Sequence, residues 1–467
     1  MPQIETDYLV IGAGAAGVAF ADALHHASGA DIVLVDRRHR PGGHWNDAYP
    51  FVRLHQPSAY YGVNSKVLGD DRVDEFGPNA GSYQRATAGE ILDYFFQVVG
   101  ELEATGRVRF FPMSDYVGDR SGEHAFTSRL TGDVISVRVR RRIVDATYLE
   151  TSIPKTHVRP FLVDAGVTCI PVNDLVGIDG PASGYTIIGA GKTAMDACNW
   201  LLDNGVGAEA IRWIRPRDSW LLDRSYTQPL EQVSWLLEGV SLGMEAVALA
   251  DDVAGLFRHL EMSGQLVRID TDVEPTMYRC ATISTSELEA LRRIKNVVRL
   301  GRVLAIGSDR IVLEGGEVPS DARQVLVDCT AEGLATPPDR PTFEPHRITV
   351  QAMRTCQPSF NSALIGFIES LGVDDGEKNR LCPPNRYPTT ADDWLRGFAL
   401  SAEAQARWTG TPEVAQWMEE SRLNAARGMA RHASEPRMKA ALDRYRGNLE
   451  PSRINAARLL ATMEPVE

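Results

Sequence analysis

The stretch DYLVIGAGAAGVAFADAL, Asp7 to Leu24, decides how the first part of the chain folds. An apolar strand runs into the turn Gly12-Ala-Gly14-Ala-Ala16-Gly17, and a helix follows. The first glycine permits the tight bend, the second lets the backbone approach a pyrophosphate, and the third lets the helix pack on the strand. Free N–H groups at the helix N-terminus then face the phosphates. The pattern therefore predicts a dinucleotide-binding βαβ unit.

The next apolar run, DIVLVD, ends at Asp36, which lies 24 residues after Gly12. A carboxylate at this position hydrogen-bonds a ribose hydroxyl of a bound dinucleotide. We place Arg37, the next residue, among the predicted cofactor contacts as well. An isolated G-x-G-x-x-G is a weak signal, and the ordered strand, turn, helix and acid make this one stronger.

The same turn occurs a second time in TIIGAGKTAMDACNWL, Thr186 to Leu201. Alanine replaces the third glycine, a change that this fold permits. The predicted contacts of a second cofactor are Gly189, Gly191, Lys192, Thr193 and Ala194. Lys192 either adds charge near the phosphates or is exposed on the first helical turn. The chain is therefore predicted to hold two dinucleotides.

The strand after the second turn ends in arginines instead of an acid. Its sequence, RWIRPRD, carries Arg215 and Arg217. A guanidinium can bind a 2′-phosphate bidentately, whereas a carboxylate would repel it. The second site is therefore predicted to prefer NADPH to NADH. The alternative is that both arginines are ordinary solvated surface residues.

The charge and the N-terminus restrict the partners and the location. A formal net charge of −13 over 467 residues disfavours nucleic acid and anionic lipid as partners. The N-terminal MPQIETD is acidic, whereas a signal peptide begins with basic residues. The apolar stretch from Tyr8 to Ala21 is too short for a membrane span of about 20 residues. We expect a cytoplasmic protein, and its oligomeric state stays open.

The six cysteines are scattered and form no C-x-x-C pair. This spacing argues against a disulfide framework, a zinc site and a dithiol redox centre. We therefore expect six reduced, mostly buried thiols and no metal ligand set. The six are Cys169, Cys198, Cys280, Cys329, Cys356 and Cys382.

The order of elements predicts an α/β fold with two Rossmann-like dinucleotide-binding domains and a helical C-terminal region. We predict a first domain over residues 1–160, an inserted domain over 161–323, and the rest of the first domain with C-terminal helices over 324–467. The run QVLVDCTAEGL, 324–334, is expected to carry the chain back to the first domain. Helices are also expected over 86–106 and 246–262.

The segment from Arg40 to Ser65 resembles a known superfamily. Its Gly42-Gly43-His44-Trp45, followed by Tyr49-Pro50, is similar to motifs of flavin-containing and Baeyer–Villiger monooxygenases. GAGKTAMD, 189–196, also resembles their NADPH turn. The resemblance implies FAD in the first domain and NADPH in the second. It further implies a single-component monooxygenase that acts on a small organic substrate with O2.

The chain departs from that superfamily in three places. The linker motif F-x-G-x-x-x-H is absent, and His157 is the one histidine between Ala146 and Pro171. The crossing motif Ala-Thr-Gly is replaced by Ala-Thr-Tyr at 146–148 and by Cys-Thr-Ala at 329–331. These departures leave two alternatives open: an NADPH-dependent flavin reductase or oxidase without oxygen insertion, or a non-catalytic FAD-binding redox sensor.

The third departure concerns the residues beside the flavin, where the superfamily has an asparagine after Tyr-Pro. Here the segment offers His55, Gln56 and, further on, Asn64 with Ser65 as candidate catalytic donors. Ordinary loop hydrogen bonding is the alternative for each. Predicted cofactor contacts in the same segment are Gly43, His44, Trp45 and Arg53. Trp45 is alternatively a plain core residue, and Arg53 alternatively pairs with an acid.

Overall fold

The strand that leads into the first glycine turn lies inside an eight-stranded sheet of the computed structural model, which describes residues 3–118, 123–321 and 323–463. The main path runs, in spatial order, through β21 (Phe343–Glu344), β22 (Arg347–Thr349), β6 (Val134–Asp145), β1 (Gln3–Ile11), β2 (Ile32–Val35) and β3 (Val108–Phe111). The hairpin of β4 (Ser114–Gly118) and β5 (His124–Ser128) joins it at β6. β1 pairs in parallel with β2 and β6, as a Rossmann-like fold requires.

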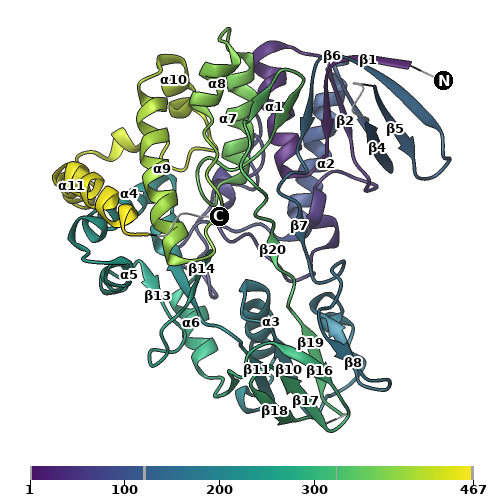
Figure 1. The fold of residues 1–467 in the computed structure, drawn as a ribbon, viewed down its shortest axis with the longest axis vertical. Helices are drawn as coiled ribbons and strands as arrows, with labels where there is room; N and C mark the ends of the chain where they lie inside the picture. The colour runs from purple at the N-terminus through teal and green to yellow at the C-terminus, as the bar shows by residue number, and fades with distance from the viewer. Residues whose placement is uncertain (1–2, 119–122, 322, 464–467) are drawn as a thin grey trace.

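Helices cover this first sheet. α1 (Ala15–Ser28) starts directly after the turn and packs against α7 (Pro358–Ser370), so residues more than 300 positions apart share one layer. α2 (Ala88–Ala104) begins with a capping box between Thr87 and Glu90, which confirms the helix expected over 86–106. α8 (Asp375–Leu381) follows α7. These elements form the upper part of Figure 1.

The second turn has a parallel sheet of its own, in the lower part of Figure 1. Its order is β15 (Asn296–Val298), β11 (Ile211–Ile214), β10 (Tyr185–Ile188), β19 (Val325–Asp328) and β9 (Cys169–Pro171). α3 (Lys192–Asp203) follows the turn, and α6 (Thr285–Arg292) packs beside α3. A small sheet of β18 (Gly316–Pro319), β17 (Arg310–Leu313), β16 (Val303–Ile306) and β8 (Leu162–Val163) extends this domain. The prediction of two Rossmann-like domains is confirmed.

The two domains repeat one another beyond the glycine turns. β6 ends in Asp-Ala-Thr at 145–147, and β19 ends in Asp-Cys-Thr at 328–330. In each, one aspartate oxygen, Oδ1, accepts hydrogen bonds from the threonine N–H and from its hydroxyl. Each Asp-x-Thr then lies against the first glycine of its own turn. The duplicated unit is therefore strand, turn, helix and a returning strand that supports the turn.

The return to the first domain differs from the prediction. The strand expected to carry the chain back, β19, pairs with β10 and β9 and so belongs to the second sheet. The crossing comes after it, where β20 (Gly333–Leu334) pairs with β7 (Thr151–Ser152) in a short ribbon between the domains. The period-two apolar pattern identified the strand, but pairing partners depend on contacts that a local pattern does not specify.

A third group of elements fills the left side of Figure 1. A three-stranded sheet of β13 (Leu266–Val267), β12 (Ser219–Asp223) and β14 (Met277–Ile283) lies beside α4 (Val233–Leu249) and α5 (Val253–Met262). The predicted C-terminal helices are α9 (Ala391–Thr409), α10 (Pro412–Glu420) and α11 (Pro436–Ala461), and α11 packs along α4. None of the helices in the described part of the chain combines the length and apolarity needed to cross a membrane.

The helix expected over 246–262 is two helices. Ala250 ends α4 in an extended conformation, and the Asp252 side chain accepts the Gly255 N–H to start α5. The apolar spacing continues through this break, which is why periodicity alone did not show it. Aspartate at an N-cap was the available local signal.

The expectation of six reduced cysteines is wrong for two of them. Cys280 in β14 and Cys356, just before α7, form a disulfide across 76 residues of sequence. The other four, Cys169, Cys198, Cys329 and Cys382, are free. The pairing results from a tertiary contact between two distant segments, so cysteine spacing carried no sign of it.

A buried ion network joins the first domain to the elements around α6. Glu287 on α6 pairs with Arg85 at 3.2 Å and with Arg224, and all three side chains are buried. Arg85 and Arg224 also donate to the Asn79 side-chain oxygen, at 3.1 and 3.3 Å. The positive charges of Lys192, Arg224 and Arg85 outweigh the burial of Glu287 and lower its pKa to about 2. The carboxylate is therefore ionised at neutral pH.

Replacing this carboxylate by its uncharged amide tests how much the network contributes. In Glu287→Gln two buried guanidinium groups lose their counter-charge, so we expect a loss of about 3–5 kcal/mol in the free energy of unfolding. Urea denaturation at neutral pH measures this loss. The matched control is Glu289→Gln, on the exposed face of the same helix, which should change stability by less than about 0.5 kcal/mol. Equal effects of the two variants would contradict the assignment.

Candidate functional site

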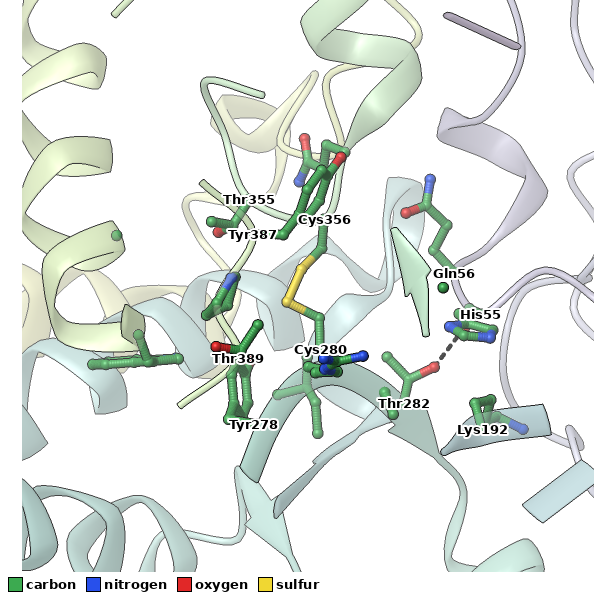
Figure 2. Close-up of a pocket in the computed structure, with 18 of the residues that line it drawn as sticks. His55, Gln56, Lys192, Tyr278, Cys280, Thr282, Thr355, Cys356, Tyr387 and Thr389 are labelled. Atoms are coloured by element: carbon green, nitrogen blue, oxygen red, sulfur yellow. Dashed lines mark hydrogen bonds between the residues drawn. A yellow bond between two sulfur atoms is a disulfide. The ribbon is translucent and has the colours of Figure 1, made fainter. Parts of the chain in front are cut away.

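A cavity of about 2360 Å³ opens where the first domain, the inserted domain and the C-terminal helices meet. The first domain contributes residues between His44 and Tyr61, and the inserted domain contributes Gly189 to Thr193 and most of β14. α9 and α11 supply much of the remaining wall. Figure 2 shows the part around His55, Lys192 and the disulfide. The C-terminal helices therefore form part of the wall of the site.

The second glycine turn opens directly into this cavity. Gly189 has φ +132°, and a Cβ added there would lie 2.6 Å from the Cys329 carbonyl oxygen, so no side chain fits. Gly191, the N-cap of α3, is exposed, and an added Cβ would meet no atom within 4 Å. The unpaired N–H groups of the first turn of α3 therefore border open space, as a phosphate group requires.

The alternative of an exposed Lys192 is wrong, whereas its predicted charge near the phosphates stays a prediction, since Lys192 lines the cavity. It is buried, and its Nζ pairs with Asp196 Oδ1 one turn along α3. The Tyr49 hydroxyl donates to the other oxygen of Asp196 at 2.7 Å, which connects this helix to the first domain. Thr193 lies on the cavity wall, and Ala194 is fully buried under the turn. The motifs at Tyr49 and Asp196 were visible in the sequence, but their contact was not.

The two predicted phosphate-binding arginines lie in different environments. Arg215 is buried, stacks on Trp213 at 4.8 Å and pairs with Asp218 at 2.8 Å. Its Nε and Nη1 have no hydrogen-bond partner in the described structure. Arg217 is exposed on the cavity wall and forms no ion pair with a described residue. Of these two arginines, Arg217 is therefore the one whose side chain is free to reach a 2′-phosphate in the cavity.

The first turn has the same close packing but lies outside the large cavity. Gly12 has φ +96°, and a Cβ at Gly17 would lie 1.9 Å from the Gly12 carbonyl oxygen. A Cβ at Gly43 would lie 2.8 Å from Gly14 Cα, so the Gly42–Gly43 loop rests on the turn. Gly12, Gly14 and Ala16 remain half-exposed. The start of α1 therefore keeps free N–H groups that fit a phosphate.

The acid after the first turn is engaged with the backbone. Asp36 is buried and accepts hydrogen bonds from Ala13 N–H at 2.7 Å and from Arg38 N–H at 2.8 Å. It therefore holds the turn in shape, and each oxygen keeps a lone pair for a ribose hydroxyl. Arg37 is exposed and pairs with Glu150 at 2.7 Å. Its predicted cofactor contact would have to compete with that ion pair.

Three further predicted cofactor contacts lie on the cavity wall. Trp45 is buried and donates through Nε1 to the Tyr61 hydroxyl at 2.8 Å, while its neighbour His44 faces the cavity. Arg53 is exposed, and its Nη1 donates to the Arg85 carbonyl at 3.1 Å. The sequence offered Trp45 either as a cofactor contact or as a core residue. In the structure Trp45 is buried and also lines the cavity.

The His55 side chain is exposed to the cavity, and protein atoms surround the ring on its other sides. Its carbonyl accepts a hydrogen bond from the Thr282 hydroxyl of β14 at 2.7 Å, as Figure 2 shows. Desolvation by the surrounding protein lowers the pKa of the His55 imidazole to about 4, and the nearby positive charge of Lys192 acts in the same direction. His55 is therefore neutral at physiological pH, with one ring nitrogen a donor and the other an acceptor.

Several polar atoms of the wall lack a protein partner in the described structure. They include Nε2 of Gln56, Oδ1 of Asn173 and the hydroxyl of Tyr387. Buried polar groups that stay unpaired cost free energy, so a polar ligand or water is expected to satisfy them. The prediction of Gln56 as a donor toward a bound ligand stays untested, and its position is suitable.

The prediction of Asn64 as a catalytic donor stays untested, and its position does not favour it. Asn64 is not part of the cavity wall. Its backbone N–H donates to Asp22 Oδ2 at 3.0 Å, and its side-chain oxygen accepts from the Ser421 hydroxyl at 2.9 Å. Ser65 also donates to Asp22. Both residues tie the segment to α1 instead of facing a substrate.

His157, the one histidine of the crossing segment, forms a largely buried contact. Its Nε2 lies 3.0 Å from Asp328 Oδ2, with both side chains largely buried, and His157 lines the cavity. Arg159 contacts the same oxygen at 3.4 Å. This group joins the outgoing crossing segment to the end of β19. No local motif indicated the contact between His157 and Asp328, because the two residues are 171 positions apart in the sequence.

The disulfide and one arginine are wall residues that sequence reasoning missed. Cys280 and Cys356 both line the cavity, and both have left-handed backbones, with φ +54° and +62°. Such a conformation costs about 1–3 kcal/mol in a non-glycine residue. Arg354 also lines the cavity and donates to the side-chain oxygens of Gln405 and Asn424, at 2.8 and 3.1 Å. It forms no ion pair with a described residue, and burial lowers its pKa to about 10.

Sequence comparisons match most of the chain to relatives that are somewhat longer than it. A model described as "NAD(P)-binding Rossmann-like domain" matches residues 10–73. The uncharacterized protein Rv2000 of Mycobacterium tuberculosis (strain H37Rv) is 47% identical over 423 residues, which is 90% of this chain and 78% of the relative. The uncharacterized protein Mb2023 of Mycobacterium bovis has the same identity and coverage.

Solved structures with a similar chain path are more distant. A cyclohexanone-bound cyclohexanone monooxygenase has 14% identity and a TM-score of 0.48, covering 93% of this chain and 98% of that one. An oxidized steroid monooxygenase bound to NADP has 16% identity and a TM-score of 0.48, covering 90% and 92%. A polycyclic ketone monooxygenase from Thermothelomyces thermophila has 15% identity and a TM-score of 0.48, covering 96% and 88%. At these values the likenesses carry no functional argument.

The neutral state of His55 makes stability depend on pH. The unfolded chain takes up a proton at this residue near pH 6.5, whereas the folded chain does so only near pH 4. Stability is therefore lost as the pH falls through this window. His55→Gln should reduce that loss by on the order of 1 kcal/mol, after allowance for solvent in the cavity. Urea denaturation at several pH values measures it. The exposed His346→Gln control should leave the slope unchanged, and an unchanged slope in His55→Gln would contradict the assignment.

Proposed function

The chain belongs to one protein family with Rv2000 of Mycobacterium tuberculosis and Mb2023 of Mycobacterium bovis, and we propose that it is an FAD- and NADPH-dependent oxidoreductase. In this proposal FAD binds at the first glycine turn and NADPH at the second. The observation that carries it is the duplicated turn supported by Asp-x-Thr, with the second copy opening into the cavity. Two such turns in one chain suit hydride transfer between two dinucleotides.

We further propose that the enzyme is a single-component monooxygenase for a small organic substrate. Bound FAD would supply the chemistry that accepts hydride and activates O2. The chain itself supplies a cavity of about 2360 Å³, with aromatic wall residues such as Tyr60, Trp394 and Phe398. Oxygen chemistry of this kind requires that water be kept away from the reacting atoms, and the wall segments from α9 and α11 would shield part of the cavity.

The wall offers a small set of hydrogen-bonding groups for orienting substrate and cofactor. Neutral His55 can donate or accept a hydrogen bond without carrying charge, and the unpaired Gln56 Nε2 is a donor. The contact of Tyr49 with Asp196 holds α3 against the first domain and so sets the distance between the two turns. Arg354, which has no acidic partner among the described residues, favours a substrate with a carbonyl or carboxylate group.

Two alternatives to the monooxygenase reaction follow from the sequence. An NADPH-dependent flavin reductase or oxidase would use the same two sites and release hydrogen peroxide or a reduced acceptor. A non-catalytic redox sensor would keep FAD and react slowly or not at all with NADPH. We also retain the cytoplasm as the proposed location. Peroxide yield measured against oxygenated product over a panel of ketones separates the first alternative from oxygen insertion.

The two-cofactor proposal predicts a spectroscopic change. The purified protein should be yellow, and NADPH added without oxygen should bleach the flavin band near about 450 nm. Stopped-flow absorbance measures the rate. A protein that takes up no FAD on reconstitution would sink the proposal, and a flavin that NADPH does not bleach would favour the sensor.

The positions of the two arginines predict different mutational effects. Arg217→Ala should raise the KM for NADPH about 10- to 100-fold and leave that for NADH nearly unchanged, because a charge-assisted phosphate contact is lost. Arg215→Ala should instead lower the melting temperature, since it breaks the buried pair with Asp218. Steady-state kinetics with both nucleotides tests the assignment. An equal change in both KM values for Arg217→Ala would refute it.

A further inference from the structure

The disulfide lies in the wall of the cavity. Cys280 and Cys356 are both half-buried and line the cavity, so their sulfur atoms are within reach of small molecules there. Figure 2 shows the bond between the cavity-facing side of β14 and the loop before α7, with Tyr278 and Tyr387 among its neighbours. The pair therefore belongs to the wall of the same site that the second glycine turn enters.

The backbone is shaped to present these two sulfur atoms. The pairing of β14 with β12 shifts register between Trp220 and Leu222, whose partners are Tyr278 and Thr282. The extra residues include Cys280, at φ +54°. A bulge of this kind re-aims a side chain. Cys356 is also left-handed, at φ +62°. Unfavourable backbones at both ends of one bond are typical of functional sites.

The surroundings would favour a thiolate at Cys356 once the bond is reduced. It immediately precedes Gln357, the N-cap of the 13-residue helix α7, so the positive end of the helix faces it. Arg354, two residues away, forms no ion pair with a described residue. The free cysteines differ, because burial raises the thiol pKa of Cys169 to about 11 and of Cys329 well above its usual value.

We propose that Cys280 and Cys356 form a redox-active pair, which NADPH reduces and a small organic disulfide reoxidises. In the reductive half, two electrons and one hydrogen from NADPH, with one proton from solvent, convert the disulfide into two thiols and leave NADP⁺. In the oxidative half, the Cys356 thiolate attacks the organic disulfide and releases one thiol. The Cys280 sulfur then displaces the second thiol and restores the bond. The net reaction turns NADPH, a proton and one disulfide into NADP⁺ and two thiols.

The inference rests on the proposed function, since NADPH and FAD supply the electrons. An anaerobic titration with thiol mapping tests it. The aerobically purified protein should yield a linked Cys280–Cys356 peptide. NADPH should then be consumed at two equivalents per flavin, one for the flavin and one for the pair, and mass spectrometry should find both cysteines alkylated. Bleached flavin after one equivalent, with both cysteines still linked, would overturn the inference and leave the proposed function standing.

A failure of the proposed function is recognised separately. If NADPH does not bleach the flavin, the flavin can be reduced by light with EDTA and the same labelling performed. Alkylation at both cysteines then supports the pair, and its absence overturns it. Free thiols at both positions in the aerobically purified protein would overturn the inference as well.

Single substitutions distinguish the roles of the two sulfur atoms. Cys280→Ser should consume one equivalent of NADPH, and with 5,5′-dithiobis(2-nitrobenzoate) it should trap a mixed disulfide on Cys356 without turnover. Cys356→Ser should also consume one equivalent and react much more slowly with the same probe at Cys280. The control Cys169→Ser, outside the cavity, should behave as the unchanged protein. Turnover of the probe at the unchanged rate in Cys280→Ser would contradict the exchange mechanism.

Discussion

The close approach of a returning strand to a glycine is the contact on which both domains depend. At Gly12 an added Cβ would lie 2.9 Å from the Thr147 side chain, and at Gly189 it would lie 2.6 Å from the Cys329 carbonyl. Each turn is therefore held between its own strand and the Asp-x-Thr at the end of the neighbouring strand. A backbone held this way aims the first N–H groups of the following helix at one point, which is the requirement for binding a phosphate.

The insertion of the second domain into the first creates the site. The chain leaves and returns through the ribbon of β7 and β20, so loops of the first domain and the glycine turn of the inserted domain line the same cavity. Polar and covalent links hold their separation: Tyr49 with Asp196, the network around Glu287, and the disulfide. Contacts of this kind have directional geometry, whereas apolar surfaces can slide. The relative position of two bound dinucleotides would thus be set by a few identifiable side chains.

The polar side chains of the cavity wall affect both ligand binding and the stability of the protein. His55 stays neutral because desolvation and Lys192 oppose its protonation, and Lys192 itself is buried because Asp196 neutralises it. Arg354 is satisfied by amide oxygens instead of a carboxylate. Unpaired atoms at Gln56, Asn173 and Tyr387 complete a wall that is polar at particular points. A wall of this composition is suited to hold a ligand in one orientation, and its unmet hydrogen bonds lower the stability of the empty protein.

Local sequence patterns were sufficient to predict much of the fold and the two phosphate-binding turns. Glycine spacing, helical periodicity and the acid at Asp36 predicted both turns, their helices and the strands beside them, because each depends on residues within about thirty positions. The burial of Arg215, the pairing of Lys192 with Asp196 and the position of Asn64 away from the cavity could not be predicted in this way. Each of these depends on what lies opposite in space.

The sequence by itself determined that two phosphate-binding turns share this chain, since a glycine's backbone freedom and a helix N-terminus are properties of short segments. Tertiary structure alone decided which strand each turn packs against, which arginine reaches the cavity, and that Cys280 meets Cys356 across 76 residues. The reason is physical: pairing, burial and charge compensation are properties of neighbours in space, and those neighbours come together only when the chain has folded.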